Sequence, residues 1–270
     1  MIWVIVWLVI CLSYTVLAIM KGLKDGYDGT QLLIVITGFI GLFSNFINLL
    51  YQNNLTFYFY WTRFKNWFRN YPAKWQLTVR YDGNFKTDPV LSIKNFLKEL
   101  SGEANVKIHH STVNSINFSV HETLNFYFDF QPKEINPFSY DTIDVSLAPF
   151  EIGSNDSRQK LNTKIVPILS KLQTEINPEN TSYVLDISFI KGNPFFNIFL
   201  SHVNSAQIDS FTINLQLSDY SSQMSKDYVT INKENVVLNA NNLHSLKELA
   251  NDFIYLSSNA KRYIKASTHG

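Results

Sequence analysis

The sequence predicts an α+β protein that begins with a two-helix transmembrane hairpin and continues as a cytoplasmic domain of antiparallel sheet with about three helices. Three observations lead to this prediction. Two long uncharged apolar stretches open the chain, segments of alternating polar and apolar residues follow, and segments with helical spacing interrupt them. The expected parts are the hairpin over residues 1–52, an interfacial elbow over 53–74, the cytoplasmic domain over 75–256 and a loose tail over 257–270.

The two apolar stretches cover residues 2–20 and 31–51, and neither contains a charged residue. A membrane-spanning helix needs about 20 apolar residues, because it rises about 1.5 Å per residue through a hydrocarbon core of about 30 Å. Both stretches reach this length, whereas a pair of buried helices in a soluble protein is the alternative. Since no Lys or Arg precedes Lys21, the first stretch lacks the basic start of a cleaved signal peptide.

The distribution of Lys and Arg predicts which side of the membrane holds the domain. The turn between the spans has two lysines offset by two aspartates, namely Lys21, Lys24, Asp25 and Asp28. The stretch after the second span is basic without acidic residues, and its charged members are Arg63, Lys65, Arg69, Lys74 and Arg80. Because basic flanks stay cytoplasmic, we expect a two-pass protein of the cytoplasmic (inner) membrane with both termini in the cytoplasm. The single cysteine, Cys11, permits no internal disulfide and fits a reducing compartment.

The segment after the second span predicts an amphipathic helix at the membrane surface. Aromatic residues recur at three-to-four spacing and share one helical face, namely Phe57, Trp61, Phe64, Phe68 and Tyr71. Trp and Tyr favour the headgroup level, and Lys and Arg favour anionic lipid. The residues expected at the interface are Trp61, Arg63, Phe64, Lys65, Trp67, Phe68 and Arg69. A surface that stacks nucleic-acid bases is the alternative, but the position directly after a span favours lipid.

The second span carries small and polar residues inside its apolar sequence, namely Gly38, Gly41, Ser44, Asn45 and Asn48. Small residues let helices approach each other, and Asn side chains can hydrogen-bond between helices. We expect these residues to pack the hairpin or an oligomer. Since polar groups are costly in a bilayer and are often functional there, the lining of a polar path through an oligomer is the second interpretation.

Alternation of polar and apolar residues predicts the strands of the sheet. It is typical of antiparallel sheets with one buried face, and the expected strands cover residues 75–81, 105–110, 115–120, 123–130, 141–148, 183–190, 195–203 and 211–217. Three helices interrupt the strands, over residues 89–101, 157–176 and 243–256. Pro167 lies inside the second helix and should kink or split it. This order suggests two β-α-β-β units, with possible subunits of the domain at 75–131 and 140–256.

A search for catalytic and metal-binding patterns in the sequence finds none that names a reaction. The candidate histidines are scattered, and adjacent His109 and His110 on a strand should point to opposite faces. The sequence has no zinc-protease motif, serine-nucleophile elbow or glycine-rich phosphate loop. The carboxylates that could form an acid pair are Asp82, Asp88, Asp141 and Asp144, but turn, cap and strand-surface roles explain them better. We therefore expect no cofactor, no metal and no catalytic residue.

The charge of the domain bears on its partners. Residues 81–270 contain 16 Lys and Arg against 20 Asp and Glu, so this part is mildly acidic. A nucleic-acid partner would require a basic face. The expected partners are the lipid bilayer, further copies of the chain, and an unidentified small ligand or protein bound by the cytoplasmic domain, with no nucleic acid.

These observations favour a function in binding. The main hypothesis is a non-catalytic sensor and effector, in which ligand or partner binding to the domain controls how the transmembrane hairpin oligomerises or packs. Such a protein would suit bacterial defence or signalling and could disrupt the membrane. The first alternative is a constitutive membrane scaffold that docks a cytoplasmic partner or an envelope machine. The second is a membrane-bound hydrolase with an unrecognised site.

Overall fold

A computed structural model of the protein describes residues 2–70, 72–85, 89–103, 105–121, 123–132, 140–190, 192–193, 212–216 and 227–254. The chain divides into two compact units, Met1–Phe64 and Lys65–Gly270. The first unit contains helices α1 (Ile2–Asp25) and α2 (Gly29–Asn53) and most of α3 (Leu55–Arg69). The second unit contains an antiparallel sheet and the remaining helices.

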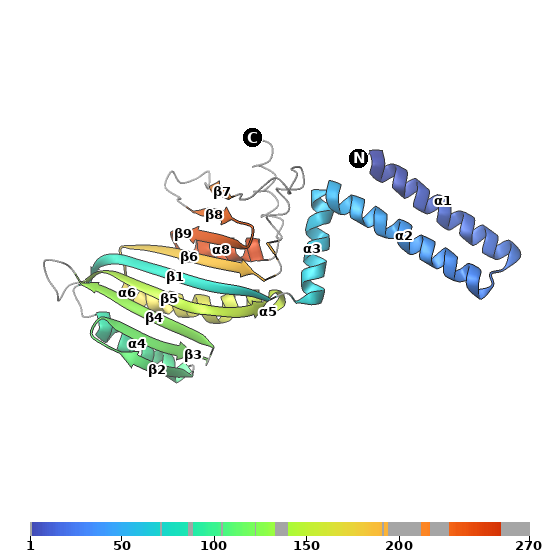
Figure 1. Ribbon diagram of the computed structural model, residues 1–270. Helices are drawn as coiled ribbons and strands as arrows, with labels where there is room; N and C mark the ends of the chain where they lie inside the picture. Colours follow the sequence, from blue (N-terminus) through green and yellow to red (C-terminus); the bar gives the residue numbers. More distant parts are fainter. Residues whose placement is uncertain are drawn as a thin grey trace. The chain divides into compact units, whose positions relative to one another are not determined.

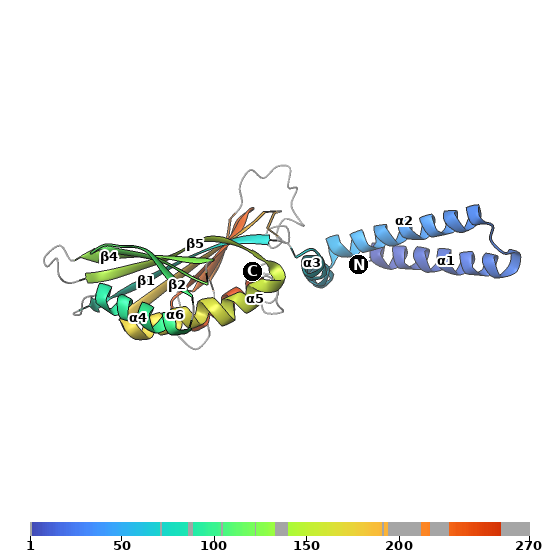
Figure 2. The same cartoon turned by 90° about the horizontal axis from the view of Figure 1, so that it is seen from below.

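Helices α1 and α2 lie side by side (Figures 1 and 2). The Tyr14 hydroxyl in α1 donates to the Val35 carbonyl oxygen at 3.4 Å. Gly38 permits this contact, because a Cβ atom there would overlap the Tyr14 hydroxyl. Asp28 caps the start of α2, since its Oδ1 accepts from the Gln31 N–H at 2.7 Å.

Among the described helices, one is long and apolar enough to cross a membrane, judged by length and composition alone. This segment, Gly29–Tyr51, has 23 residues and belongs to α2. In α1 the corresponding apolar stretch is shorter and covers Val9–Gly22. The helix predicted as the second span is therefore long and apolar enough to cross a membrane, whereas the first span stays a prediction.

The second unit is built on one nine-stranded antiparallel sheet with the order β2-β3-β4-β5-β1-β6-β9-β8-β7 (Figure 1). The strands are β1 (Pro72–Phe85), β2 (Val106–Ser111), β3 (Ser115–Val120), β4 (Leu124–Pro132), β5 (Tyr140–Gly153), β6 (Asn180–Phe189), β7 (Ile213–Gln216), β8 (Tyr228–Ile231) and β9 (Asn235–Ala240). The two longest strands, β1 and β5, pair with each other near the middle of the sheet.

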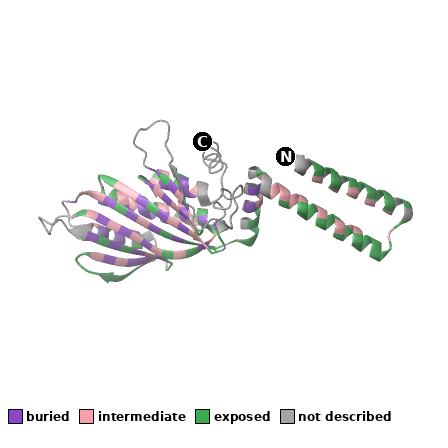
Figure 3. Ribbon diagram, turned by 45° about the horizontal axis from the view of Figure 1, so that its top comes forward, coloured by how far each residue is buried: buried purple, intermediate pink, exposed green. Residues whose placement is uncertain are grey.

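Helices cover one face of this sheet, as Figure 2 shows for α4, α5 and α6. They are α4 (Pro89–Glu103), the continuous run of α5 (Ser154–Lys160), the π-helical turn η1 (Leu161–Ile165) and α6 (Val166–Ile176), and α8 (Leu243–Ile254). Alternate strand residues point toward the helices and form the core, so buried and partly exposed positions alternate along most of the described strands (Figure 3). In β1, for example, Leu77, Val79 and Tyr81 are each at most 2% exposed.

The predicted α+β class, with an antiparallel sheet and several helices, is confirmed. The strands of the two suggested β-α-β-β segments join one sheet, in which β1 lies between β5 and β6 of the later segment. Pro167 lies in the first turn of α6, directly after the π-helical turn. The wider turn lets the chain pass the proline, which cannot donate a backbone hydrogen bond, without ending the helix. The predicted strand 195–203 and the predicted tail 257–270 lie outside the described residues.

Two tyrosines from adjacent central strands lie in the core. Tyr81 in β1 and Tyr183 in β6 are both fully buried. The Tyr183 hydroxyl donates to Oε1 of Gln173 in α6 at 3.2 Å, which shows that this side chain faces the helices. Burial raises the pKa of Tyr183 to about 12 and raises that of Tyr81 well above its usual value of 10.0.

The raised pKa of Tyr183 predicts a loss of stability in alkali. The folded state holds the phenolic proton of Tyr183 more tightly than the unfolded state does. The stability gained from this difference is fully present below the unfolded pKa of 10.0 and is lost as the pH rises toward 12. We expect Tyr183→Phe to flatten the fall in the free energy of unfolding over this range. Urea unfolding at successive pH values measures the free energy of unfolding, and Tyr127→Phe, a change at an exposed tyrosine, is the control. An unchanged slope in Tyr183→Phe would contradict the prediction.

Candidate functional site

The face of the sheet opposite the helices is lined with polar side chains. Tyr183 faces α6 and pairs in register with Val79, so the neighbours of Val79 in β1, Thr78 and Arg80, point away from the helices. The same register places further side chains on this face, which we call the polar sheet face: Asn117, Tyr127, Asp129, Asp144, Ser146, Ser182, Val184 and Asn239. Most of them are half-buried or exposed hydroxyl and amide groups.

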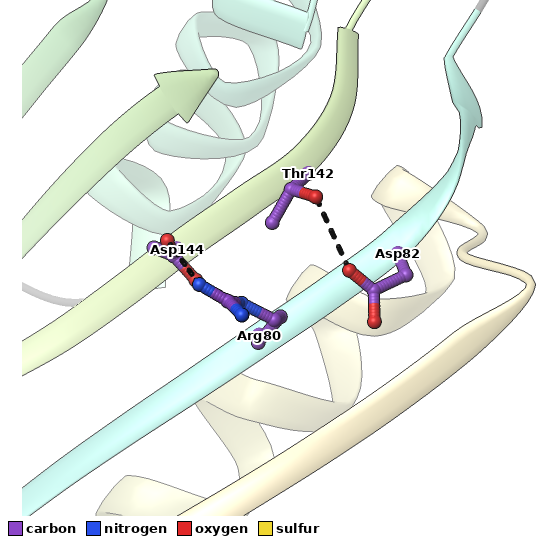
Figure 4. A network of polar contacts seen from close by, with 4 residues as sticks. All are labelled: Arg80, Asp82, Thr142 and Asp144. Carbon is purple, nitrogen blue, oxygen red and sulfur yellow. Dashed lines mark hydrogen bonds and ion pairs between the residues drawn. The ribbon is translucent and has the colours of Figure 1, made fainter.

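An ion pair lies near the centre of the polar sheet face (Figure 4). Arg80 Nε donates to Asp144 Oδ1 at 2.8 Å, and Arg80 Nη2 donates to Asp144 Oδ2 at 3.1 Å. These hydrogen bonds, and then the Asp144 charge, raise the pKa of Arg80. Nearby, Asp82 Oδ1 accepts from the Thr142 hydroxyl at 3.2 Å. Since the Arg80 side chain is 52% exposed, the pair sits open to a ligand and adds little to stability.

A second carboxylate lies beside this pair without a partner. Asp129 in β4 is directly opposite Asp144 in register and makes no hydrogen bond or ion pair within the described residues. Like charges directly opposite each other on adjacent strands are destabilising. Asp129 is therefore the position at which this face would best receive a cationic group.

The row of side chains next to these charges is neutral and contains two tyrosines, one in β4 and one in β8. Register pairing connects Tyr127, Ser146, Thr78, Val184, Asn239 and Tyr228 across six strands. Tyr127 and Tyr228 are 47% and 43% exposed, and the residues between them have shorter side chains. Tyr with small hydroxyl and amide residues is a composition typical of protein-binding surfaces.

One serine and one histidine lie within hydrogen-bond distance on the same face. His109 Nε2 is 3.0 Å from the Ser119 hydroxyl oxygen. The Ser119 side chain is buried, at 5% exposure, so it is not presented to a substrate. A β-bulge between Ile108 and His110 interrupts the register of β2, and His110 lies opposite Asn117. The prediction that the adjacent histidines point to opposite faces is therefore wrong, because the extra residue of a bulge shifts the alternation.

The other candidates for chemistry remain apart. Among the described residues, no three His, Cys, Asp or Glu side chains gather as a metal site would need. His121 has a left-handed backbone (φ 52°) in the turn after β3, and His244 lies 3.3 Å from Glu248 on α8. Asp141 is exposed at the start of β5. Asp88 and His202 lie outside the described residues.

The small and polar residues of α2 divide into two groups. Gly38 contacts Tyr14 on the side of α2 that faces α1. Gly41, Ser44, Asn45 and Asn48 are exposed, and a Cβ at Gly41 would meet open space. The two asparagine side chains make no hydrogen bond within the described residues. Four of the five predicted residues thus stay exposed beside the contact of α1 with α2, and we call these four the polar α2 face.

Helix α3 begins and ends differently from the predicted elbow. Asn54 caps its start, because Asn54 Oδ1 accepts from the Phe57 N–H at 3.0 Å. The helix ends at Arg69, and β1 begins at Pro72. Tyr71, the last aromatic residue of the predicted face, lies outside the described residues. Trp61, Phe64, Lys65, Phe68 and Arg69 are partly or fully exposed, whereas the side chains of Arg63 and Trp67 lie outside the described part.

Asn70 joins the end of α3 to the first turn of α5. Its backbone is left-handed (φ 42°), and its Oδ1 accepts from the Asn155 N–H at 3.0 Å. Gly153 makes room for this contact, because a Cβ atom there would overlap the Asn70 side chain. Sequence analysis missed this joint, since its partners are far apart along the chain.

Comparison with known proteins adds no assignment. No protein-family model matches the chain, and no curated protein matches it. Among solved structures it is similar to an aspartate kinase of Clostridium acetobutylicum, at 14% sequence identity and a TM-score of 0.20. The match covers 67% of this chain and 33% of the kinase chain, so the chain spans about a third of that protein's length. A TM-score this low does not establish a shared fold.

Proposed function

We propose that the protein is a membrane-anchored, non-catalytic sensor and effector. In this proposal α1 and α2 cross the cytoplasmic membrane as a hairpin, and the α+β domain lies in the cytoplasm. The polar sheet face binds a ligand or a partner protein, and binding changes how the hairpins of several copies pack. Loss of tight packing among hairpins would then open the membrane, as a defence or signalling effector in bacteria requires.

The observation that carries the proposal is the free polar α2 face. An amide without a hydrogen-bond partner is costly in hydrocarbon, because no water is present to satisfy it. Since both side chains are exposed and make no hydrogen bond within the described residues, Asn45 and Asn48 can be satisfied by the same residues of a second copy. Asn has both donor and acceptor groups, so two identical faces are complementary. Gly41 and Ser44 allow the helices to approach closely.

The polar sheet face supports the sensor part of the proposal. It combines the Arg80–Asp144 pair, Asp129 and two exposed tyrosines on one broad surface that none of the described helices covers. These groups can hydrogen-bond to a ligand, receive a cation and stack on a planar group. Because the nearby Ser119 is buried, the same surface favours binding over nucleophilic catalysis.

A constitutive scaffold is the second candidate, and the row from Tyr127 to Tyr228 favours it. A flat surface of Tyr, Ser, Thr and Asn suits a protein partner better than a small enclosed ligand. In this case the hairpin anchors the protein, and its packing does not respond to the partner.

The mass of the detergent-solubilised full-length protein tests the proposal. The sensor and effector should form particles of several 31.2 kDa chains and should resist carbonate extraction from membranes. Its expression in bacteria should make the membrane permeable to a small dye under conditions that supply the ligand. A strictly monomeric particle together with intact membranes would refute the effector function and leave the scaffold.

A further inference from the structure

Helix α3 carries an aromatic stripe on its exposed surface. The stripe consists of Phe57, Trp61, Phe64 and Phe68, which recur every three to four residues. The ring centroids of Phe57 and Trp61 are 5.9 Å apart, as are those of Trp61 and Phe64, and both pairs are stacked. Phe64 and Phe68 are 53% and 75% exposed. Exposure of several neighbouring aromatic side chains on one helix indicates a surface that meets an apolar partner.

A side of the helix next to this stripe is buried. Tyr58 and Thr62 are buried, at 7% exposure each, and the Tyr58 ring lies 4.6 Å from that of Tyr51 in α2. Asn54, between the two helices, is extended (φ −124°, ψ 103°), so α3 does not continue the axis of α2. The contact between Tyr51 and Tyr58 thus packs this side of α3 against α2, while Phe64 and Phe68 of the stripe stay exposed.

We propose that the aromatic stripe of α3 docks at the headgroup level of an anionic lipid bilayer, with Lys65 and Arg69 binding the lipid phosphates. Both basic residues are exposed and lie within one turn of a stripe residue. The inference rests on the proposed function in one respect, since it requires that α2 crosses the membrane. Helices with an aromatic face and basic residues beside it lie in the interface plane and bind more strongly as lipid becomes more anionic.

Two observations favour lipid over nucleic acid as the occupant. The apolar stretch of α2 ends at Tyr51, so the bilayer surface lies only a few residues before the start of α3. The chain has no acidic residue between Asn53 and Arg80, whereas residues 81–270 are net acidic and would repel a phosphate backbone. Arg80 does not add to the basic patch, because its charge is paired with Asp144.

Fluorescence quenching in lipid nanodiscs tests the docking with the full-length protein. Cys11→Ser provides a cysteine-free background, and Phe64→Cys, Phe68→Cys or Tyr127→Cys then introduces one labelling position. We expect lipid spin-labelled near the headgroup to quench the dye at positions 64 and 68 but not at 127, and more so with phosphatidylglycerol than with phosphatidylcholine alone. Lys65→Gln with Arg69→Gln should lower the docked-to-undocked ratio in anionic discs by roughly 30-fold.

Matched controls separate the possible outcomes. Lys94→Gln with Lys98→Gln removes the same charge from the exposed side of α4 and should leave the quenching unchanged. Equal quenching at positions 64, 68 and 127 in a protein that resists carbonate extraction would overturn the docking and leave the proposed function standing. Extraction of the protein by carbonate would overturn both. Loss of the quenching at positions 64 and 68 when an oligonucleotide is added would show that the aromatic stripe binds nucleic acid instead of lipid.

Discussion

Replacing Phe118 with alanine should lower the free energy of unfolding of the α+β domain by about 3–5 kcal/mol. Phe118 in β3 is fully buried, and its ring centroid lies 5.4 Å from those of both Phe126 and Phe128 in β4. Removing the ring deletes both stacking contacts and leaves a cavity that the rigid sheet cannot close. Urea unfolding of the full-length protein in mild detergent, followed by the circular dichroism of the sheet, measures the loss.

The control for this substitution comes from the neighbouring strand. Tyr127 lies between Phe126 and Phe128 in sequence, but its side chain points to the polar sheet face and is 47% exposed. Tyr127→Ala should change the free energy of unfolding by no more than about 0.5 kcal/mol. Equal losses in the two variants would mean that the helices do not cover the face on which Phe118 lies.

Replacing both asparagines of the polar α2 face with leucine should weaken self-association of the full-length protein by roughly 10- to 100-fold. Asn45 and Asn48 make no hydrogen bond within the described residues of one chain, so any bonds that they form inside a bilayer would come from another copy. Leucine keeps the helix apolar and membrane-compatible while removing these bonds. Energy transfer between differently labelled copies in liposomes, measured over a range of protein-to-lipid ratios, gives the change in association.

Ile36→Leu with Phe43→Leu is the matched control. Both residues are exposed on α2 on a flank other than the polar face, so the control introduces the same residue type on the same helix. Its association should equal that of the unchanged protein. If the Asn45→Leu and Asn48→Leu variant associates as strongly as this control does, the polar α2 face is not the contact between copies, and the effector function loses its main support.

Local patterns predicted the elements of the fold well, and their arrangement much less. The alternation from Ser115 to Val120 and the helical spacing over residues 89–101 depend on neighbouring residues, and β3 and α4 follow these patterns. The position of β1 between β5 and β6 depends on pairing across long separations, which no local pattern contains. The expected strands therefore match β1 to β7 along the chain, but they gave no bounds for β8 and β9 and did not reveal the single sheet.

For the candidate sites too, the sequence predicted the features that depend on neighbouring residues and missed those that depend on residues far apart along the chain. The polar residues of the second predicted span can be recognised in the sequence, because Asn45 and Asn48 interrupt an otherwise apolar stretch. Arg80 was grouped with the basic residues near the membrane, since its partner Asp144 lies 64 positions later. A bulge such as that at His109 is equally hard to foresee, because it depends on how β2 pairs with β3.

The central place of β1 has a consequence for how the protein is made. The ribosome produces β1 before both of its neighbours, since β5 begins at Tyr140 and β6 at Asn180. At ordinary rates of translation, both edges of β1 stay unpaired for on the order of ten seconds. An open strand edge invites pairing with the wrong chain. If α2 holds the nascent chain at a membrane, as proposed, the chain meets fewer such partners, and this attachment also protects β1 during synthesis.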